Sequence, residues 1–313
     1  MRLVCHLTDL PHAELAGGSA VTIGSYDGLH PGHRQLLERL LAAARERNVP
    51  SVVMSFEPTP KEFFSADTPP ARLMRFREKF DALADCGIDV FYCPRFSKAM
   101  RSIAADAFIR RILVHGLNAR HVVIGDDFRF ARKREGSIAE LQRAAPALRY
   151  SIEQVPSVIV DGIRVSSTAI REALAAGEVR RATALLGHPY RMSGRIVRGR
   201  RVGRSLGYAT ANVDLRRRKS AVMGIYAVRV HGLPEGPIDG VASVGTRPTF
   251  DLTKPLLEVH LFDFDRDVYG EYIHVDFIEH LRHEIKFDAV DELVAQMQID
   301  EENARSALAR DTA

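Results

Sequence analysis

The chain has 313 residues, of which 46% are hydrophobic and 27% are charged, and this composition argues against a disordered or fibrous protein. The 44 basic and 40 acidic residues leave a net charge of only +4, which argues against a dedicated nucleic-acid-binding protein and suits small anionic substrates. At about 150 residues per domain, the length predicts two domains.

The sequence shows no pattern typical of a membrane or secreted protein. No apolar stretch approaches the roughly 18 residues that a transmembrane helix needs. The N-terminal segment carries Asp9 and Glu14 and lacks the apolar core of a signal peptide. The three cysteines form no CxxC pair, which argues against a disulfide framework or a zinc site. We therefore expect a cytoplasmic protein without a membrane partner.

Strand and helix patterns alternate through the first part of the chain. Short apolar runs predict strands at Ala20–Gly24, Ser51–Phe56, Val90–Cys93 and His121–Gly125. Helical patterns follow these strands at His33–Asn48, Arg75–Cys86, Ala104–Val114, Thr168–Ala176 and Arg180–Leu186. Strands separated by helices indicate a parallel sheet with helices on both faces, which is an α/β domain of the Rossmann-like class.

The pattern changes after Pro189–Ser193, which lacks helical periodicity and is predicted to be a linker. In Leu256–Phe262 and in Tyr272–Phe277, alternate residues fall on opposite faces of an extended segment. Such segments, broken by Gly and Pro, predict antiparallel strands of a small β-barrel or sandwich. Asp291–Ala309 is predicted to form a closing helix.

The densest chemical signal is the stretch VTIGSYDGLHPGHRQLL, where a strand runs through a glycine-rich loop into a helix. Gly24 ends the strand, and Gly28 and Gly32 let the backbone approach a ligand closely. His30 and His33 are three residues apart, so both imidazoles lie on one side of the first helical turn, where phosphate is favoured. They are candidates to stabilise charge on a nucleotide phosphate, and the alternative is a strand–helix turn with incidental histidines.

This stretch resembles the signature of the HxGH nucleotidyltransferases, in particular of their flavin-adenylylating branch. Gly125–Phe130 resembles the G-x-D-F-x-F-G element of that branch, with Ala131 in the place of the last glycine. Ser166–Arg171 resembles the S-S-T-x-I-R element that opens a late helix. Taken alone, these two segments would be a solvated turn and an ordinary helix N-cap.

The resemblance implies adenylyl transfer, which needs positioning and charge neutralisation rather than covalent catalysis. His30 and His33 are then the catalytic residues at the α- and β-phosphates of ATP, and Ser167, Thr168 and Arg171 bind the departing pyrophosphate. The full expected ATP-binding set is Gly24, Tyr26, Asp27, Gly28, His30, His33, Ser166, Ser167, Thr168 and Arg171.

Two loops are candidates for flavin contact in this first domain. The resemblance implies that Asp126, Asp127, Phe128 and Arg129 lie by the adenosine or the flavin. Phe56 and Pro58 follow the second strand at its carboxyl end, where open α/β sheets bind ligands. The alternative for that second loop is a mere connection between elements.

Glycines and arginines cluster again at residues 194–214, GRIVRGRRVGRSLGYATANVD. A flexible basic loop of this kind can wrap phosphates with its backbone N–H groups. Thr210 and Asn212 offer two neutral oxygens on one side of an extended segment, which suits a Mg²⁺–nucleotide. The alternatives are an exposed basic hairpin and an RNA-binding loop.

The cluster resembles the G-x-x-x-G-R-x-L-G-x-P-T-A-N hallmark of riboflavin kinases, with Ala209 in place of proline. By this resemblance, Thr210 and Asn212 are also the expected metal ligands. The expected ATP-binding residues of the kinase are Gly199, Gly203, Arg204, Gly207, Thr210 and Asn212.

Two residues further along the chain are candidates for the kinase reaction. Glu258 lies on the strand face opposite Leu257 and Val259, and with the resemblance it is the candidate general base for the ribityl 5′-hydroxyl. Without the resemblance, Glu258 would be a surface glutamate. Arg282 is a candidate contact for flavin or phosphate, with a solvated charge as the alternative.

Together, the resemblances cover residues 20–290 in the order of the bacterial bifunctional riboflavin kinase/FMN adenylyltransferase (FAD synthetase) family. They imply an FMN adenylyltransferase domain at residues 1–187 and a riboflavin kinase domain at 188–313. The expected substrates are ATP, riboflavin and FMN, with Mg²⁺ as cofactor and no nucleic acid; the oligomeric state stays open. The alternatives are a nucleotidyltransferase for another phosphorylated acceptor and an RNA-binding protein that uses Arg195–Arg204.

Overall fold

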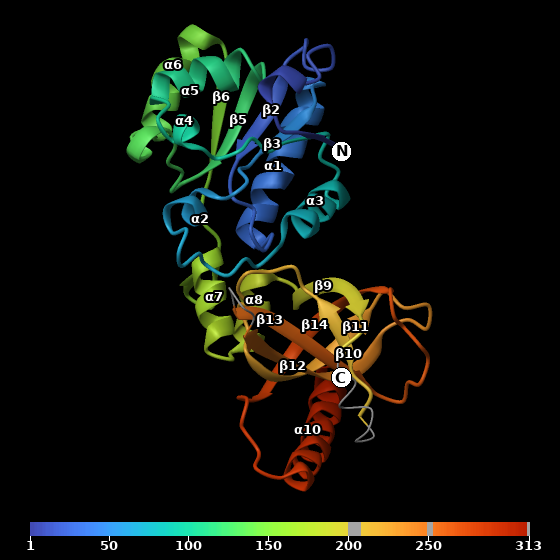
Figure 1. The fold of residues 1–313 in the computed structure, drawn as a ribbon. Coiled ribbons are helices and arrows are strands. Elements are labelled where there is room, and N and C mark those ends of the chain that lie inside the picture. The colour runs from blue at the N-terminus through green and yellow to red at the C-terminus, as the bar shows by residue number, and fades with distance from the viewer. Residues whose placement is uncertain (200–207, 249–252, 312–313) are drawn as a thin grey trace. The chain divides into compact units, whose positions relative to one another are not determined.

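The structure is a computed structural model that describes residues 1–199, 208–248 and 253–311. Its chain divides into two compact units (Figure 1). Unit 1 contains Met1–Pro70 and Met74–Val165, and unit 2 contains Ala71–Leu73 and Ser166–Ala313.

A six-stranded sheet forms the centre of unit 1, with the strand order β1-β4-β3-β2-β5-β6 and every neighbouring pair parallel. Parallel neighbours require crossover connections, which the helices of this unit supply. The prediction of a parallel sheet with helices is confirmed. The strands are β1 Arg2–Val4, β2 Ser19–Ile23, β3 Ser51–Met54, β4 Val90–Tyr92, β5 Ala119–Gly125 and β6 Ser151–Val155.

The other elements of unit 1 connect these strands or follow them. The helices are α1 Pro31–Arg47, α2 Pro60–Phe64, α3 Phe76–Asp85, α4 Lys98–Arg101, α5 Ala105–Phe108, α6 Ile138–Leu148, the π-helical η2 Ile109–Val114 and the 3-10 turns η1 Leu7–Asp9 and η3 Arg132–Arg134. A small hairpin of β7 Ile159–Val160 and β8 Ile163–Arg164 ends the unit.

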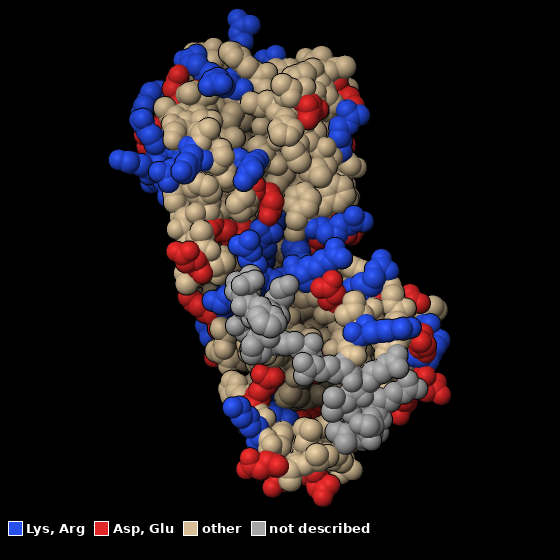
Figure 2. Space-filling model, in the orientation of Figure 1, with Lys and Arg blue, Asp and Glu red and all other residues tan. Residues whose placement is uncertain are grey.

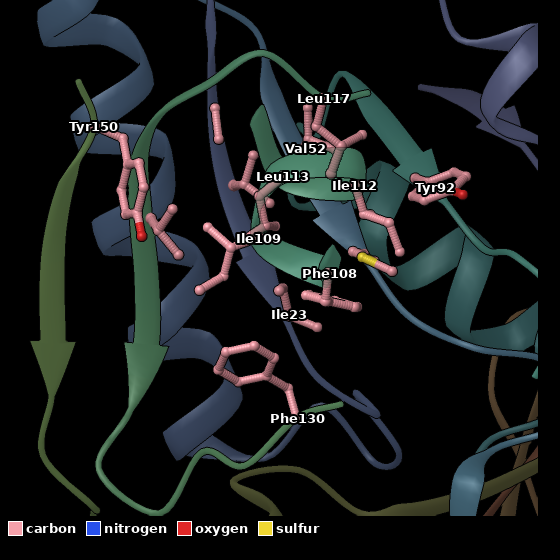
Figure 3. Close-up of a cluster of buried hydrophobic side chains, with 14 of the residues drawn as sticks. Ile23, Val52, Tyr92, Phe108, Ile109, Ile112, Leu113, Leu117, Phe130 and Tyr150 are labelled. Carbon is pink, nitrogen blue, oxygen red and sulfur yellow. The ribbon is translucent and has the colours of Figure 1, made fainter. Parts of the chain in front are cut away.

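Buried side chains pack on both faces of the sheet in unit 1. Successive residues of a strand point to opposite faces, so each strand contributes to both clusters. On β3, Val52 and Met54 lie in one buried cluster, whereas Val53 lies in a second cluster with residues of α1 and α3. Figure 3 shows the first cluster, in which the side chains of Phe108, Ile109, Ile112 and Leu113 pack near Ile23 and Val52. This burial on both faces explains why the strands appear in the sequence as nearly continuous apolar runs.

A closed barrel of six antiparallel strands forms the centre of unit 2, in the order β10-β13-β12-β11-β14-β9. Two helices, α7 Ser167–Ala175 and α8 Val179–Leu186, precede the barrel in the chain. The strands are β9 Tyr190–Val197, β10 Ala211–Asp214, β11 Gly224–His231, β12 Ile238–Pro248, β13 Thr253–Leu261 and β14 Tyr272–Arg282.

The predicted linker Pro189–Ser193 is wrong, because β9 begins at Tyr190. Tyr190 and Met192 are buried, whereas Arg191 between them is exposed and forms an ion pair with Asp276. This alternation is the period of a strand, and the pairing of β9 with β14 satisfies its backbone. The segment is too short for the pattern to be recognised without its partner strand.

The predicted closing helix is confirmed as α10, Val290–Asp311. Its Ala304, Ala307 and Leu308 are buried against barrel residues that include Ala227 and Ile278. Apolar residues in the C-terminal part of the helix therefore cover part of the outer surface of the barrel.

Replacing Phe277 with alanine is expected to destabilise unit 2 by about 3–5 kcal/mol, the usual effect of removing a buried phenylalanine ring. Phe277 is 0% exposed, and its ring centroid lies 5.7 Å from that of Tyr190 and 5.2 Å from that of Tyr226. Chemical denaturation followed by circular dichroism measures the change. A loss below about 1 kcal/mol would contradict the packing described here.

Candidate active sites

The loop between β2 and α1 brings the two predicted histidines of unit 1 together. His30 is the N-cap of α1, and its Nδ1 accepts a hydrogen bond of 3.4 Å from the backbone N–H of His33. The two imidazoles are stacked, with ring centroids 3.7 Å apart and planes inclined by 16°. The expectation that both rings share one side of the first helical turn is confirmed. Gly28, with φ of +98°, supplies the left-handed turn that precedes them.

His33 is buried, and its Nδ1 has no hydrogen-bond partner among the described residues. Burial holds the pKa of His33 well below the ordinary value for histidine, and the charges of His30 and Lys79 lower it further. The ring is therefore neutral at neutral pH. A neutral imidazole can donate one hydrogen bond from its N–H to a phosphate oxygen without adding a net charge to the site.

Tyr26 and Asp27, both predicted to bind ATP, are buried within the same loop. The Tyr26 hydroxyl lies 2.7 Å from that of Thr22, and burial raises the pKa of Tyr26 above its ordinary value. Asp27 Oδ1 accepts a hydrogen bond of 2.8 Å from the backbone N–H of Met74. In the structure, these two side chains hold the loop in place around the histidines. Gly24, which follows β2, lies against the ring of Tyr26.

The predicted flavin loop at residues 126–129 is tied to the β7–β8 hairpin. Asp126 accepts hydrogen bonds from the Ser157 backbone N–H at 2.9 Å and from its hydroxyl at 2.7 Å. The Ser157 hydroxyl lowers the pKa of Asp126, with a further contribution from Arg164. Asp127 pairs with Arg164 at 2.8 Å. This loop is thus held by hydrogen bonds at its start.

The remaining members of the two flavin loops differ in exposure. The ring of Phe128 stacks on that of Phe130 at 5.5 Å, whereas Arg129 is exposed. Phe56 is half-buried and meets the edge of Phe96, with ring centroids 5.4 Å apart. Pro58, also half-buried, lies between β3 and α2.

The predicted pyrophosphate residues lie on the first turns of α7, which belongs to unit 2. Ser166 is the N-cap, and its hydroxyl accepts a hydrogen bond of 3.1 Å from the N–H of Ala169. Ser167 and Thr168 occupy the first turn of this helix. Arg171 donates to the carbonyl of Ala71 at 2.6 Å and to that of Ser167 at 3.0 Å.

The barrel brings Asn212 and Glu258 together across neighbouring strands. Asn212 on β10 and Glu258 on β13 are directly paired in the antiparallel register. Gly199 approaches so closely that a Cβ atom there would overlap the amide of Asn212. Asn212 is buried and Glu258 is half-buried. Oxygen donors of this kind are those that Mg²⁺ prefers, so the residues fit a nucleotide-bound magnesium ion.

A cavity of about 450 Å³ is lined by Thr210 and by Ala211 and Val259, which are the chain neighbours of Asn212 and Glu258. The carbonyl of Ala209 lies 2.9 Å from Nδ1 of His260, and Cζ of Arg198 lies 5.6 Å from the ring centroid of Tyr269. Polar residues that line the cavity are Thr210, His260, Asp265, Arg266, Asp267 and Tyr269.

Sequence reasoning assigned no role to the cavity residues other than Thr210. The stretch Asp267–Gly270, between β13 and β14, is a signal that could have pointed to them, because a turn between two strands brings its side chains to one end of the barrel. The predicted Gly203, Arg204 and Gly207 lie outside the described residues.

Arg282, the predicted flavin contact of the kinase, forms an ion pair with Asp300 of α10. Its Nε and Nη2 donate to the two carboxylate oxygens at 2.8 Å and 2.6 Å. Asp300 is 5% exposed, so this bidentate pair is largely shielded from water. In the structure, Arg282 fastens the closing helix to β14.

Both signs of charge occur on the surface of each unit (Figure 2). Basic and acidic side chains are interspersed over the visible face of each unit (Figure 2). Within the described ranges, no group of three His, Cys, Asp or Glu side chains is arranged to hold a metal ion. Among the same residues, no helix combines the length and apolar character that crossing a membrane requires.

Comparisons with known proteins assign each half of the chain to a family. The family model described as FAD synthetase matches residues 12–169, and the model described as riboflavin kinase matches residues 186–308. A bifunctional riboflavin kinase/FMN adenylyltransferase of Escherichia coli K12 is 45% identical over 305 residues, which cover 97% of each chain. One from Haemophilus influenzae is 43% identical over 290 residues, 92% of this chain and 94% of that protein.

A solved structure is similar over nearly the whole chain. It is a crystal structure named a macrolide-efflux protein, from Streptococcus pneumoniae, with a TM-score of 0.81 and 32% identity over 97% of this chain and 98% of that one. The family models and the curated relatives agree on the order of the two domains, and the relatives cover nearly all of the chain. The chain therefore belongs to the bifunctional riboflavin kinase/FMN adenylyltransferase family, with an FAD synthetase domain followed by a riboflavin kinase domain.

Proposed function

We propose that the chain converts riboflavin to FAD in two ATP-dependent steps, one in each domain. The riboflavin kinase domain transfers the γ-phosphate of ATP to riboflavin and yields FMN and ADP. The FAD synthetase domain transfers AMP from a second ATP to FMN and yields FAD and pyrophosphate. The observation that carries the proposal is a chemically suited site in each unit: stacked histidines at the start of α1, and Asn212 opposite Glu258 on the barrel.

In the kinase step, the oxygen of the ribityl 5′-hydroxyl attacks the γ-phosphorus of ATP. The Glu258 carboxylate accepts the proton of that hydroxyl during the attack. Thr210 and Asn212 are the residues proposed to hold Mg²⁺, which would neutralise phosphate charge when bound with the nucleotide. The cavity lined by Thr210 is proposed to hold ATP, because the stretch that resembles the riboflavin kinase hallmark includes Thr210. Gly199, Gly203, Arg204 and Gly207 are proposed to wrap the phosphates, and Arg282 to contact the flavin or to orient β14 beside it.

In the adenylyl transfer step, an FMN phosphate oxygen attacks the α-phosphorus of ATP and pyrophosphate leaves. His30 and His33 donate hydrogen bonds to the α- and β-phosphate oxygens, whose charge grows in the transition state. Ser167, Thr168 and Arg171 are proposed to bind the pyrophosphate, and Asp126–Arg129 with Phe56 and Pro58 to contact the flavin.

The functional boundary is proposed at residues 187 and 188, which assigns α7 and α8 to adenylyl transfer although compactness groups them with unit 2. None of the three cysteines forms a disulfide, as suits a reducing compartment, so a cytoplasmic location is part of the proposal. The substrates are small molecules, and no nucleic-acid or membrane partner is proposed.

One incubation tests the proposal. Purified protein is mixed with riboflavin, ATP and Mg²⁺, and the flavins are separated by chromatography over time. FMN is expected first and FAD afterwards. A mixture that holds neither product would refute the proposal, and pyrophosphate release with a different phosphorylated acceptor but not with FMN would favour the alternative nucleotidyltransferase.

Replacing Gly199 with alanine is expected to lower kcat/KM of the kinase step by about 10²-fold, because misplacing a positioning group by about 1 Å has effects of this size. The added methyl group would overlap the buried amide of Asn212 and displace it. FAD formation from supplied FMN by the same protein is the internal control and is expected to stay within twofold. A variant with normal kinase kinetics would show that the kinase step does not depend on the close contact between Gly199 and Asn212.

A further inference from the structure

A basic turn continues the predicted flavin loop of unit 1. Four of residues 129–134, called the basic turn below, are basic, and the side chains of these four are exposed: Arg129, Arg132, Lys133 and Arg134. Arg132 lies 3.4 Å from a carboxylate oxygen of Glu135. In the part of the chain that the structure describes, the other three form no ion pair, so the turn exposes three cations that no carboxylate contacts.

The acidic side chains next to the basic turn have partners of their own. Arg164 lies 2.8 Å from Asp127 and 3.4 Å from Asp126. Glu135 accepts a hydrogen bond of 3.1 Å from the backbone N–H of Ala105. The four cations of the turn and Arg164 make five positive charges against these three carboxylates, so the local charge is +2.

Contacts at its base hold the basic turn in one shape. Phe130 and Gly136 exchange two backbone hydrogen bonds of 3.0 Å, which close the turn. The ring of Phe130 is buried and stacks on that of Phe128, with ring centroids 5.5 Å apart. Within the turn, the backbone N–H of Arg132 donates to the carbonyl of Ile103 at 2.8 Å. The cations are therefore carried on a backbone whose position is fixed.

The backbone of the basic turn is also strained. Ala131, Lys133 and Arg134 have φ angles of +66°, +51° and +60°. These values lie in the left-handed region, which non-glycine residues adopt at an energetic cost. Such strain persists only where surrounding contacts impose it, and it is concentrated at functional sites. Glycine would fill these positions without that strain, so the charged side chains indicate a role beyond closing a turn.

The basic turn follows β5 at the edge of the sheet that carries the histidines. β5 pairs in parallel with β2, and the loop after β2 leads to His30 and His33. Since the carboxyl ends of parallel strands meet at one edge, both loops leave the sheet on the same side, where open α/β sheets bind ligands. An anion that approaches the histidines therefore approaches the side of unit 1 on which the basic turn lies.

We propose that the basic turn captures phosphate-bearing substrates of the adenylyl transfer step and raises the rate at which they reach the site. FMN carries a phosphate monoester and ATP a triphosphate, so exposed cations attract both. The inference rests on the proposed adenylyl transfer at His30 and His33. Lys133 and Arg134 act on the encounter with substrate, and the chemical step does not require them.

Two consequences distinguish capture from a role in the chemical step. Removing the cations should lower kcat/KM and leave kcat unchanged, because kcat describes substrate that is already bound. Salt should abolish the difference, since the screening length of the solution falls from about 30 Å at 0.01 M to about 3 Å at 1 M ionic strength. A purely structural defect of the turn would instead lower activity at every salt concentration.

The test uses the full chain and the double variant Lys133→Gln with Arg134→Gln. This variant removes two charges and leaves Arg129, which belongs to the proposed flavin loop, in place. Initial rates of FAD formation are measured with FMN varied at saturating Mg-ATP, and with Mg-ATP varied at saturating FMN. Each series is run at ionic strengths from about 0.02 M to about 0.5 M, a range over which screening changes strongly.

The matched control is Arg45→Gln with Arg149→Gln. Both side chains are exposed, and within the described ranges neither forms an ion pair. Arg149 has a φ of +56°, so it reproduces the left-handed backbone of Arg134. Arg45 lies in the last turn of α1, and Arg149 lies between α6 and β6, so the control removes the same charge at the opposite edge of the sheet.

At low salt, the double variant is expected to lose about fivefold to tenfold in kcat/KM for FMN, for ATP or for both, which is the lower end of the range for electrostatic steering. Its kcat should stay within twofold, and the difference from the wild type should vanish at high salt. The control is expected to match the wild type throughout. The substrate whose kcat/KM falls is the one that the turn captures.

An unchanged kcat/KM for both substrates at low salt would overturn the inference, as would a loss that persists at high salt or a fall in kcat alone. If the double variant does not fold, Lys133→Gln alone decides, with an expected loss of about twofold to threefold in kcat/KM at low salt. A wild-type protein that forms no FAD would instead refute the proposed function.

Discussion

Replacing Glu258 with glutamine is expected to stop FMN formation from riboflavin, with a loss in kcat of about 10²–10⁴-fold, the range that general-base catalysis contributes. Glutamine keeps the size of the side chain but cannot accept the hydroxyl proton as a carboxylate does. Glu258 is half-buried on β13 opposite Asn212, so the change removes a base without opening a cavity. The rate of FMN appearance from riboflavin measures the effect.

The same protein should still convert supplied FMN to FAD at the wild-type rate, because that step belongs to the other domain. Glu292→Gln serves as the control, since Glu292 lies in unit 2 on α10 and is exposed. A Glu258→Gln variant that is folded and makes FMN normally would show that another group takes the proton. Loss of both activities in a folded variant would contradict the division of labour.

Replacing both His30 and His33 is expected to produce the opposite result, with FAD formation lost and FMN formation retained. Each hydrogen-bond donor aimed at developing charge contributes about 10²–10³-fold in kcat, so the double variant should fall below detection. Conversion of FMN to FAD, followed by chromatography, measures the loss. Riboflavin phosphorylation by the same sample shows that the chain is intact.

The choice of substitutions matters because His30 also caps α1. His30→Ala removes the acceptor for the His33 N–H and would weaken the helix by about 1 kcal/mol, whereas His30→Asn keeps a good capping residue. The variant His30→Asn with His33→Gln therefore separates catalysis from folding. His12→Ala, at an exposed position of the same unit, is the control. FAD formation that survives in the double variant would remove these histidines from the mechanism.

Local patterns in the sequence were sufficient for the class of each unit. Continuous apolar runs separated by helical stripes predicted the parallel sheet, and alternation at Leu256–Phe262 predicted a barrel strand, because both patterns follow from the geometry of one element. The three-residue spacing of His30 and His33 likewise predicted that both imidazoles lie on one side of α1, since both residues belong to the first turn of the helix. These predictions needed no information about distant contacts.

Features that depend on contacts between distant segments were not predictable. Lys79 fits an ordinary helix pattern, and its burial depends on a carbonyl 54 residues earlier in the chain. The partner of Arg282 lies on the closing helix, and the strand at Tyr190 is stabilised by pairing with β14. The register that sets Asn212 opposite Glu258 was not predictable from the local sequence either, because the pairing of strands depends on the whole barrel.

The central claim is that the two domains direct attack at different phosphorus atoms of ATP. In the riboflavin kinase domain riboflavin attacks the γ-phosphorus, and in the FAD synthetase domain FMN attacks the α-phosphorus. Two parallel incubations with riboflavin, one with ATP radiolabelled at the γ-phosphate and one at the α-phosphate, test it most directly. The γ-label is predicted in both FMN and FAD, and the α-label in FAD alone. An α-label in FMN, or FAD without the α-label, would contradict the account.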